Sequence, residues 1–129
     1  MLFRSRPSNA FGPNDKFDYE KCHVTPANIR KVADRLNPIP IWGDGSDVRD
    51  LLHVEDMADG FIFVAENCDT YDIYNVCYGE GFSVNEVLGW IKDLDDNHFP
   101  VEYVNNKADR KSTRLNSSHV SESRMPSSA

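Results

Sequence analysis

The sequence has 129 residues, enough for one small core, and 40% of them are hydrophobic, an ordinary value for a globular chain. The formal net charge of −7 argues against a nucleic-acid partner, because phosphate backbones select basic surfaces. No apolar run approaches the roughly 18 residues that a membrane span needs, so we expect no membrane partner. The three cysteines, without a signal peptide, indicate reduced thiols and a cytoplasmic protein.

The first third of the chain predicts a strand end, a long polar loop and a helix. Met1–Arg4 has the pattern of a strand end, and residues 8–23 are expected to form a loop because the pairs GP and ND favour turns. A helix should follow, with Thr25 as its cap and Pro26 at the first helical position. Its apolar residues recur at helical spacing at Ile29, Val32, Ala33 and Leu36. The Asn37-Pro38 pair should end it.

Strands and helices then alternate along the chain. The expected strands are Ile39–Trp42, Val48–Val54, Tyr71–Val76 and Val101–Val104. Helices are expected over Glu55–Glu66 and from Ser83 onward, where the run SVNE has the spacing of a capping box. The expected buried side of the first of these helices consists of Met57, Ala58, Phe61, Ile62 and Ala65. This alternation predicts an α/β fold.

The last 21 residues differ in composition from the rest. Residues 109–129 hold four Lys+Arg, two Asp+Glu and seven serines, whereas residues 1–108 hold 10 Lys+Arg and 19 Asp+Glu. The segment has almost nothing to bury, so it cannot offset its ordering entropy. Written as codons, DRKSTRLNSSH and SRMPSSA resemble two fixed parts of a short-read sequencing adapter read in frame. We therefore interpret residues 109–129 as a non-native disordered tail and residues 1–108 as the domain.

Three segments of the domain resemble the C-terminal part of extended short-chain dehydrogenase/reductases, in the NAD-dependent epimerase/dehydratase family. They are RPSNAFGPND at 6–15, IWGDGSDVRDLLHVEDMADG at 41–60 and YNVCYGEGFSVNEVL at 74–88. The resemblance implies an α/β fold that is the substrate-binding part of a Rossmann-type reductase, with the Rossmann half mostly absent. Residues 11–31 most resemble the GDP-L-fucose synthase subfamily.

The resemblance also implies an activity for the parent protein. It would be an NAD(P)-dependent epimerase/reductase acting on GDP-4-keto-6-deoxymannose, cytoplasmic and homodimeric, and the fragment alone would be inactive. A UDP-sugar epimerase or decarboxylase, a sugar-nucleotide 4,6-dehydratase and a non-catalytic sugar-nucleotide-binding module remain alternatives. NAD(P) is implied for the parent only, because the sequence lacks the glycine-rich turn that holds a dinucleotide.

Two residues are candidates for contacts with the nucleotide sugar. The resemblance assigns a contact with the diphosphate to Arg49, whose planar guanidinium can bind phosphate oxygens through two parallel bonds. The alternative is a surface arginine paired with Asp50 or Glu55. The resemblance assigns a substrate contact to Asn9, whose amide offers both donors and an acceptor. The alternative is an asparagine that structures its own loop.

The segment around the first helix supplies three further candidates. Arg30, Lys31 and Arg35 form a positive rim that would attract a diphosphate, or else a solvated helix face. The resemblance favours Arg30 and Lys31 as the substrate contacts. His23 matches the subfamily histidine that protonates carbanionic intermediates, and an imidazole can exchange protons near neutral pH. The alternative is a structural histidine, which is our expectation for His53. Residues 93–98 hold three aspartates and a histidine but lack the spacing of a calcium loop, so no metal site is expected.

Overall fold

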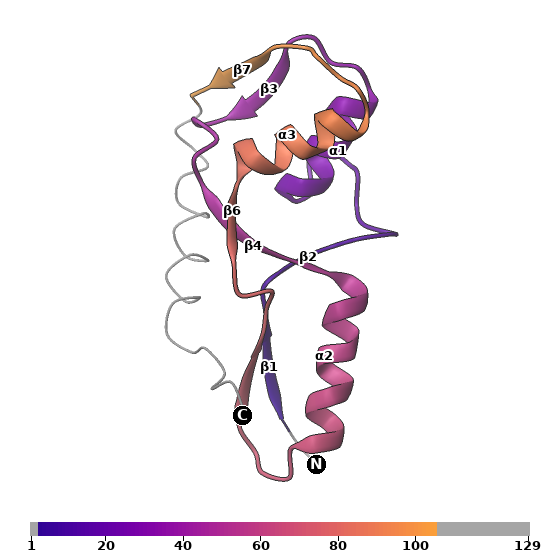
Figure 1. Cartoon of the computed structure of the whole chain (residues 1–129), viewed down its shortest axis with the longest axis vertical. Coiled ribbons are helices and arrows are strands. Elements are labelled where there is room, and N and C mark those ends of the chain that lie inside the picture. Colours follow the sequence, from indigo (N-terminus) through magenta and orange to yellow (C-terminus); the bar gives the residue numbers. More distant parts are fainter. Residues whose placement is uncertain (1–2, 106–129) are drawn as a thin grey trace. The chain divides into compact units, whose positions relative to one another are not determined.

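The computed structural model describes residues 3–105, in which strands and helices alternate as the sequence predicts (Figure 1). The strands are β1 Arg4–Pro7, β2 Asn9–Phe11, β3 Ile39–Trp42, β4 Val48–His53, β5 Ile73–Val76, β6 Gly81–Ser83 and β7 Val101–Val104. The helices are α1 Val24–Ala33, α2 Val54–Asn67 and α3 Val84–Leu94. None of these described helices combines the length and the apolar content that crossing a bilayer requires. The expected tail at 109–129 lies outside the described residues.

The described residues form two compact units, and the first comprises residues 3–13 and 50–81. In it β1 pairs in parallel with β5, with Arg4 opposite Ile73. Helix α2 packs against β5 over a core of Leu52, Met57 and Val76, with Phe61 beside them. Gly60 allows this close approach, because a Cβ at that position would lie 2.8 Å from Cγ1 of Val76.

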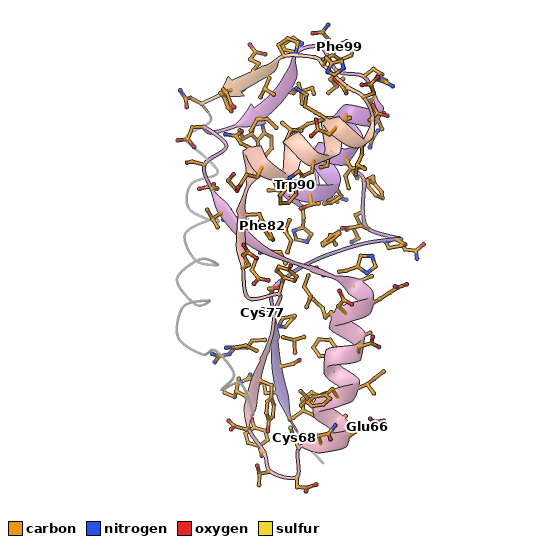
Figure 2. The ribbon with its side chains drawn as sticks, in the orientation of Figure 1. Glu66, Cys68, Cys77, Phe82, Trp90 and Phe99 are labelled. Atoms are coloured by element: carbon orange, nitrogen blue, oxygen red, sulfur yellow. The ribbon has the colours of Figure 1, made fainter. Side chains whose placement is uncertain are left out.

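The second unit comprises residues 14–49 and 82–105. Strands β3 and β7 pair in parallel, with Ile39 opposite Val101, and α1 and α3 lie side by side against them (Figure 1). The core consists of Val32, Ile39, Ile41 and Leu88, flanked by Val84, Ile91, Phe99 and Val101. Phe82 and Trp90 meet edge to face with ring centroids 5.2 Å apart (Figure 2). This core therefore joins α1 and β3, at residues 24–42, to α3 and β7, at residues 84–104.

The predicted capping box at the start of α3 is confirmed. The Ser83 hydroxyl accepts a hydrogen bond from the Glu86 amide at 3.2 Å, and the Glu86 carboxylate accepts one from the Ser83 amide at 2.8 Å. The Ser83 amide, and then the Ser83 hydroxyl, which also donates to the Glu86 carboxylate at 2.8 Å, hold the pKa of the Glu86 carboxyl below its usual value. The two amides before Glu86 also have acceptors, since Val84 donates to the Asp47 carbonyl and Asn85 to the Gly45 carbonyl. The N-terminus of α3 is therefore satisfied by protein groups.

The start of the first helix differs from the prediction. Helix α1 begins at Val24 with His23 as its N-cap, so Thr25 is not the cap and Pro26 occupies the third helical position. The buried face is set by Pro26, Asn28 and Val32, while Ile29 is exposed. Tertiary packing, and not local capping preference, decided where this helix starts and how it is rotated.

Two strand predictions and one helix face are also corrected. β1 runs from Arg4 to Pro7 and β2 forms inside the predicted loop, because β5 and β4 supply hydrogen bonds that the local sequence does not reveal. On α2, Ile62 is 54% exposed and Val64 is buried instead. The predicted burial of Ala58 and Ala65 is likewise wrong, since both are exposed.

A side-chain cluster ties the loop before α1 to the helix. The Tyr19 hydroxyl donates to the Asp34 carboxylate at 2.8 Å, and Nε of Arg30 donates to the same oxygen at 3.2 Å. The Arg30 guanidinium also lies 4.3 Å from the centroid of the Tyr19 ring and donates to the Phe17 carbonyl. The Tyr19 bond and then Arg30 lower the pKa of the Asp34 carboxyl, while burial and the Asp34 bond raise the pKa of Tyr19.

Core packing on α3 generates the first prediction. Leu88 is 2% exposed and Leu94, on the same helix, is 90% exposed. We expect Leu88→Ala to lower the free energy of unfolding by about 2–5 kcal/mol, because it removes buried methyl groups and leaves a cavity. Leu94→Ala is the matched control and should change it by less than about 0.5 kcal/mol. Urea denaturation followed by circular dichroism measures both, and equal effects would contradict the core described above.

The Tyr19 cluster generates the second prediction, on pH dependence. Because the folded pKa of Asp34 is lowered, this carboxylate stabilises the fold above its unfolded pKa, and the contribution is lost as pH falls through the folded pKa. Tyr19→Phe removes the largest cause, so the pKa of Asp34 should rise toward its usual value and acid unfolding should begin at a higher pH. Carboxyl ¹³C NMR titration measures this shift. The Glu86 titration serves as the internal control, and an unchanged Asp34 curve would refute the prediction.

Candidate functional site

The candidate residues divide between the two units, and Asn9 lies in the first. It begins β2, opposite Leu51 of β4, and its side chain is exposed. Its amide nitrogen donates to the Asp50 carbonyl at 3.2 Å, so part of the side chain holds the strand pair together. Within residues 3–105 its side-chain oxygen accepts no hydrogen bond. Asn9 thus combines the structuring role with an acceptor that a ligand hydroxyl can use.

Arg49 lies in β4 with a side chain that is 18% exposed. One terminal nitrogen donates to the Val48 carbonyl at 3.1 Å, and the other lies 3.7 Å from the Asp47 carboxylate. The alternative that Arg49 pairs with Asp50 or Glu55 is wrong, because its ion-pair partner is Asp47. Because a guanidinium has five N–H donors and the Asp47 contact is long, Arg49 keeps donors for an anionic ligand.

The Asp50 carboxylate has a role that sequence reasoning missed. It accepts backbone hydrogen bonds from Tyr78 at 3.0 Å and from Gly79 at 2.6 Å, and so anchors the turn after β5. The partners lie 28 and 29 residues further along the chain, so no local pattern could have revealed the contact.

Arg30 and Lys31 are less open than the predicted positive rim requires. The bonds from Arg30 to Asp34 and to the Phe17 carbonyl commit its Nε and one terminal nitrogen. The Lys31 ammonium lies 5.9 Å from the centroid of the Trp42 ring. Burial holds the pKa of Lys31 below its usual value, and neighbouring Cys22 acts in the opposite direction. Arg30 therefore stabilises the loop, whereas Lys31 sits beside an exposed aromatic ring.

The three histidines of the described chain have different environments. His53 caps α2, accepting a hydrogen bond from the Glu55 amide at 3.3 Å, and meets the Phe11 ring edge to face. His98 lies 3.1 Å from the Asp96 carboxylate. His23 is exposed at the N-cap of α1, and its imidazole has no hydrogen-bond partner among residues 3–105. Of the three, His23 is the one whose ring nitrogens are available to a ligand.

The N-terminus of α1 also differs from that of α3. No acceptor within the described part of the chain binds the amides of Val24 and Thr25, Pro26 has no amide hydrogen, and the first turn contains no acidic residue. Such a terminus carries partial positive charge and is a natural position for an anion. In the second unit, His23 therefore stands beside backbone donors that have no acceptor among residues 3–105.

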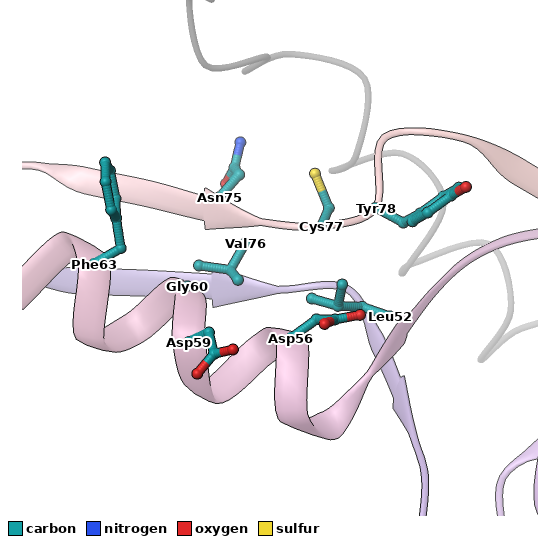
Figure 3. A pocket seen from close by; sticks show the side chains of 9 residues that line it. All are labelled: Leu52, Asp56, Asp59, Gly60, Phe63, Asn75, Val76, Cys77 and Tyr78. Atoms are coloured by element: carbon teal, nitrogen blue, oxygen red, sulfur yellow. The ribbon is translucent and has the colours of Figure 1, made fainter.

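A groove in the first unit is poorly suited to a diphosphate. It has a volume of about 640 Å³ and runs along α2 and β5 (Figure 3). It contains none of the predicted site residues; its lining is Leu52, Asp56, Asp59, Gly60, Phe63, Asn75, Val76, Cys77 and Tyr78. The Asp56 and Asp59 carboxylates would repel phosphate groups.

The cysteines and the potential metal ligands of the described residues are further site candidates. Cys22, Cys68 and Cys77 are free thiols. Burial, and then the nearby Asp50 carboxylate, raise the pKa of Cys77, so its thiol stays protonated near neutral pH. Across residues 3–105, no group of three or more His, Cys, Asp or Glu side chains is arranged to hold a metal ion.

Comparisons with known proteins agree with the fold and with the first two sequence segments, at 6–15 and 41–60. Residues 4–77 match the NAD dependent epimerase/dehydratase family. Probable GDP-L-fucose synthase 1 of Oryza sativa subsp. japonica is 35% identical over 92 residues, which cover 68% of this chain and 28% of the rice protein. A dTDP-4-dehydro-6-deoxy-D-allose reductase of Streptomyces sp is 37% identical over 90 residues, covering 70% of this chain and 27% of that protein.

A solved structure extends the likeness to the fold. The UDP-N-acetylglucosamine 4-epimerase of Methanobrevibacter ruminantium M1, in complex with UDP-N-acetylmuramic acid, superimposes with a TM-score of 0.74 and 26% identity. The match covers 82% of this chain and 34% of the epimerase. The match thus covers about a third or less of each of these three relatives. The family match over residues 4–77 confirms the resemblance inferred from the sequence, and the chain belongs to the NAD dependent epimerase/dehydratase family.

Proposed function

We propose that the chain is the substrate-binding part of a cytoplasmic, homodimeric enzyme that epimerises and reduces a GDP-linked 4-keto-6-deoxyhexose. The likeness to the rice GDP-L-fucose synthase supports this choice of substrate. The parent protein would bind NAD(P)H, which would supply the hydride for the reduction. This chain's own residues would bind the nucleotide sugar and move a proton.

The state of His23 carries the proposal. Its imidazole is exposed, has no partner among the described residues and stands at the start of α1 beside the Val24 and Thr25 amides. An acid/base group must reach its substrate. His53 accepts a hydrogen bond from the Glu55 amide and would have to break that bond first, whereas His23 would not. Epimerisation next to a keto group needs a base that removes a proton, which leaves a carbanion, and an acid that returns a proton to the opposite face. His23 would return the proton, and a base in the rest of the parent protein would remove it.

Arg49 is proposed to bind the diphosphate. Its guanidinium is mostly buried but only loosely paired with Asp47 at 3.7 Å. A doubly charged diphosphate would compete well with this single carboxylate, because charge-assisted and bidentate bonds are stronger than one long contact. Asn9, in the first unit, is a separate candidate for a contact with the nucleotide sugar through its side-chain oxygen.

A second candidate is an enzyme acting on a dTDP- or UDP-linked sugar. The identity of 37% to the Streptomyces dTDP-sugar reductase favours it. Contacts from Arg49 to phosphate oxygens do not separate these substrates, since the diphosphate is common to them and the base is not. Binding without catalysis is the expected behaviour of the chain by itself.

The Arg49 assignment generates a binding prediction. Arg49→Ala should weaken GDP binding to the 129-residue chain at least about tenfold, because it removes a charge-assisted bond to the diphosphate. Arg35→Ala is the matched control: it removes the same charge from a side chain paired with Asp95 at 3.2 Å, and should leave affinity unchanged. Isothermal titration calorimetry measures both. Tighter binding of UDP or dTDP than of GDP would select the second candidate, and equal losses in both variants would refute the Arg49 role.

The His23 assignment is tested in a complete enzyme. The matching segment of the rice relative would be replaced by that of this chain, and solvent deuterium incorporation into the GDP-linked sugar would be followed by NMR. His23→Gln should slow incorporation about 10²- to 10⁴-fold while GDP affinity stays the same, as expected for loss of a proton-transfer group. His98→Gln, which alters an 86% exposed side chain, is the control. Undiminished exchange in His23→Gln would refute the acid/base role.

A further inference from the structure

The turn that precedes β4 is held in place by one side chain of α3. The Asn85 amide nitrogen donates to the Asp44 carbonyl at 3.1 Å, and the Asn85 side-chain oxygen accepts from the Tyr103 hydroxyl at 3.1 Å. These partners lie 41 and 18 residues away in the sequence. A single amide thus ties the 43–47 turn, the first turn of α3 and strand β7 together.

Gly45 shows how closely this side chain is seated. Its φ is +73°, and it is buried under Asn85. A Cβ at this glycine would lie 2.0 Å from the Asn85 side-chain oxygen, so no other residue fits while Asn85 keeps its position. The backbone amide of Asn85 also donates to the Gly45 carbonyl at 3.0 Å. The contact is therefore a specific fit between a turn and a helix terminus.

The same turn leads directly to Arg49. The Asp47 carbonyl accepts a hydrogen bond from the Val84 amide at 3.0 Å, and the Asp47 carboxylate is the ion-pair partner of Arg49. Within the turn, the Asp44 carboxylate accepts from both the amide and the hydroxyl of Ser46. The path of the backbone into β4, and with it the direction of the Arg49 side chain, depends on how this turn is fixed to α3.

We propose that Asn85 is a positioning residue for Arg49, holding the 43–47 turn so that the guanidinium is ready for the diphosphate. The inference rests on the proposed function, in which Arg49 binds that diphosphate. The backbone amides at the N-terminus of α3 donate to carbonyls of this turn and are therefore not available to the diphosphate. Under this proposal, the N-terminus of α3 contributes to ligand binding only by holding the turn that leads to Arg49. Preorganisation of this kind favours binding because less conformational entropy is lost when the ligand arrives.

The test measures GDP binding to the full 129-residue chain by isothermal titration calorimetry. Asn85→Ala should weaken binding about tenfold, because both side-chain hydrogen bonds are lost. Tyr103→Phe removes one of them and should weaken it about threefold. In the Arg49→Ala background, Asn85→Ala should cause no further loss, since its effect passes through Arg49. Asn67→Ala is the matched control, because this exposed asparagine also donates to a backbone carbonyl, that of Phe63.

Two results would overturn the positioning role while leaving the proposed function intact. They are unchanged affinity in Asn85→Ala, and an equal additional loss when Asn85→Ala is combined with Arg49→Ala. If circular dichroism shows that Asn85→Ala does not fold, the same cycle with Tyr103→Phe decides.

A wild-type chain that binds no GDP would instead remove the proposed function. The role of Asn85 is then decided without ligand, by ¹⁵N relaxation of the Arg49 Nε–H group. Greater motion of that group in Asn85→Ala or Tyr103→Phe than in the wild type supports positioning. Unchanged motion in both variants overturns it.

Discussion

The second unit depends on one small apolar core, in which Val32, Ile39, Ile41 and Leu88 pack together. These residues come from α1, β3 and α3, so the core fixes the three elements that carry or support most candidate residues. Polar groups at the ends of these elements are thereby brought within hydrogen-bonding distance of one another. The turn before β4 meets α3, and the loop before α1 folds back onto its helix. The site chemistry is thus positioned by burial of a few aliphatic side chains.

The protein is acidic, with a net charge of −7. Two of its arginines have structural partners: Arg30 donates to the carbonyl of Phe17 in the preceding loop, and Arg35 pairs with Asp95. Arg49 is the contrast, since its guanidinium is largely buried and its ion-pair contact is long. In the proposed function, a mostly buried cation with spare donors would favour a ligand that offers several phosphate oxygens at fixed positions.

The proposed chemistry is divided between this chain and the rest of the parent protein. Relatives of the family are about three to four times longer than the part matched here, and the chain contains no dinucleotide-binding turn. Hydride transfer is cofactor chemistry, so the part described here would supply recognition of the nucleotide sugar and a proton donor. The free imidazole at the start of α1 and the guanidinium in β4 match those two tasks. Each unit is compact in its own right.

The sequence by itself determined the α/β alternation, the capping box at Ser83 and the family, because these depend on local spacing and on motifs read in order. It also singled out His23 and Arg49, whose chemical types are visible in the motifs. Only the tertiary structure decided that His23 occupies the N-cap position of α1 without a side-chain capping bond, while Arg30 is tied to the preceding loop. It also revealed the contacts of Asp50 and Asn85. The physical reason is distance along the chain: these partners are brought together by strand pairing and core packing, which leave no periodic signal in the residues themselves.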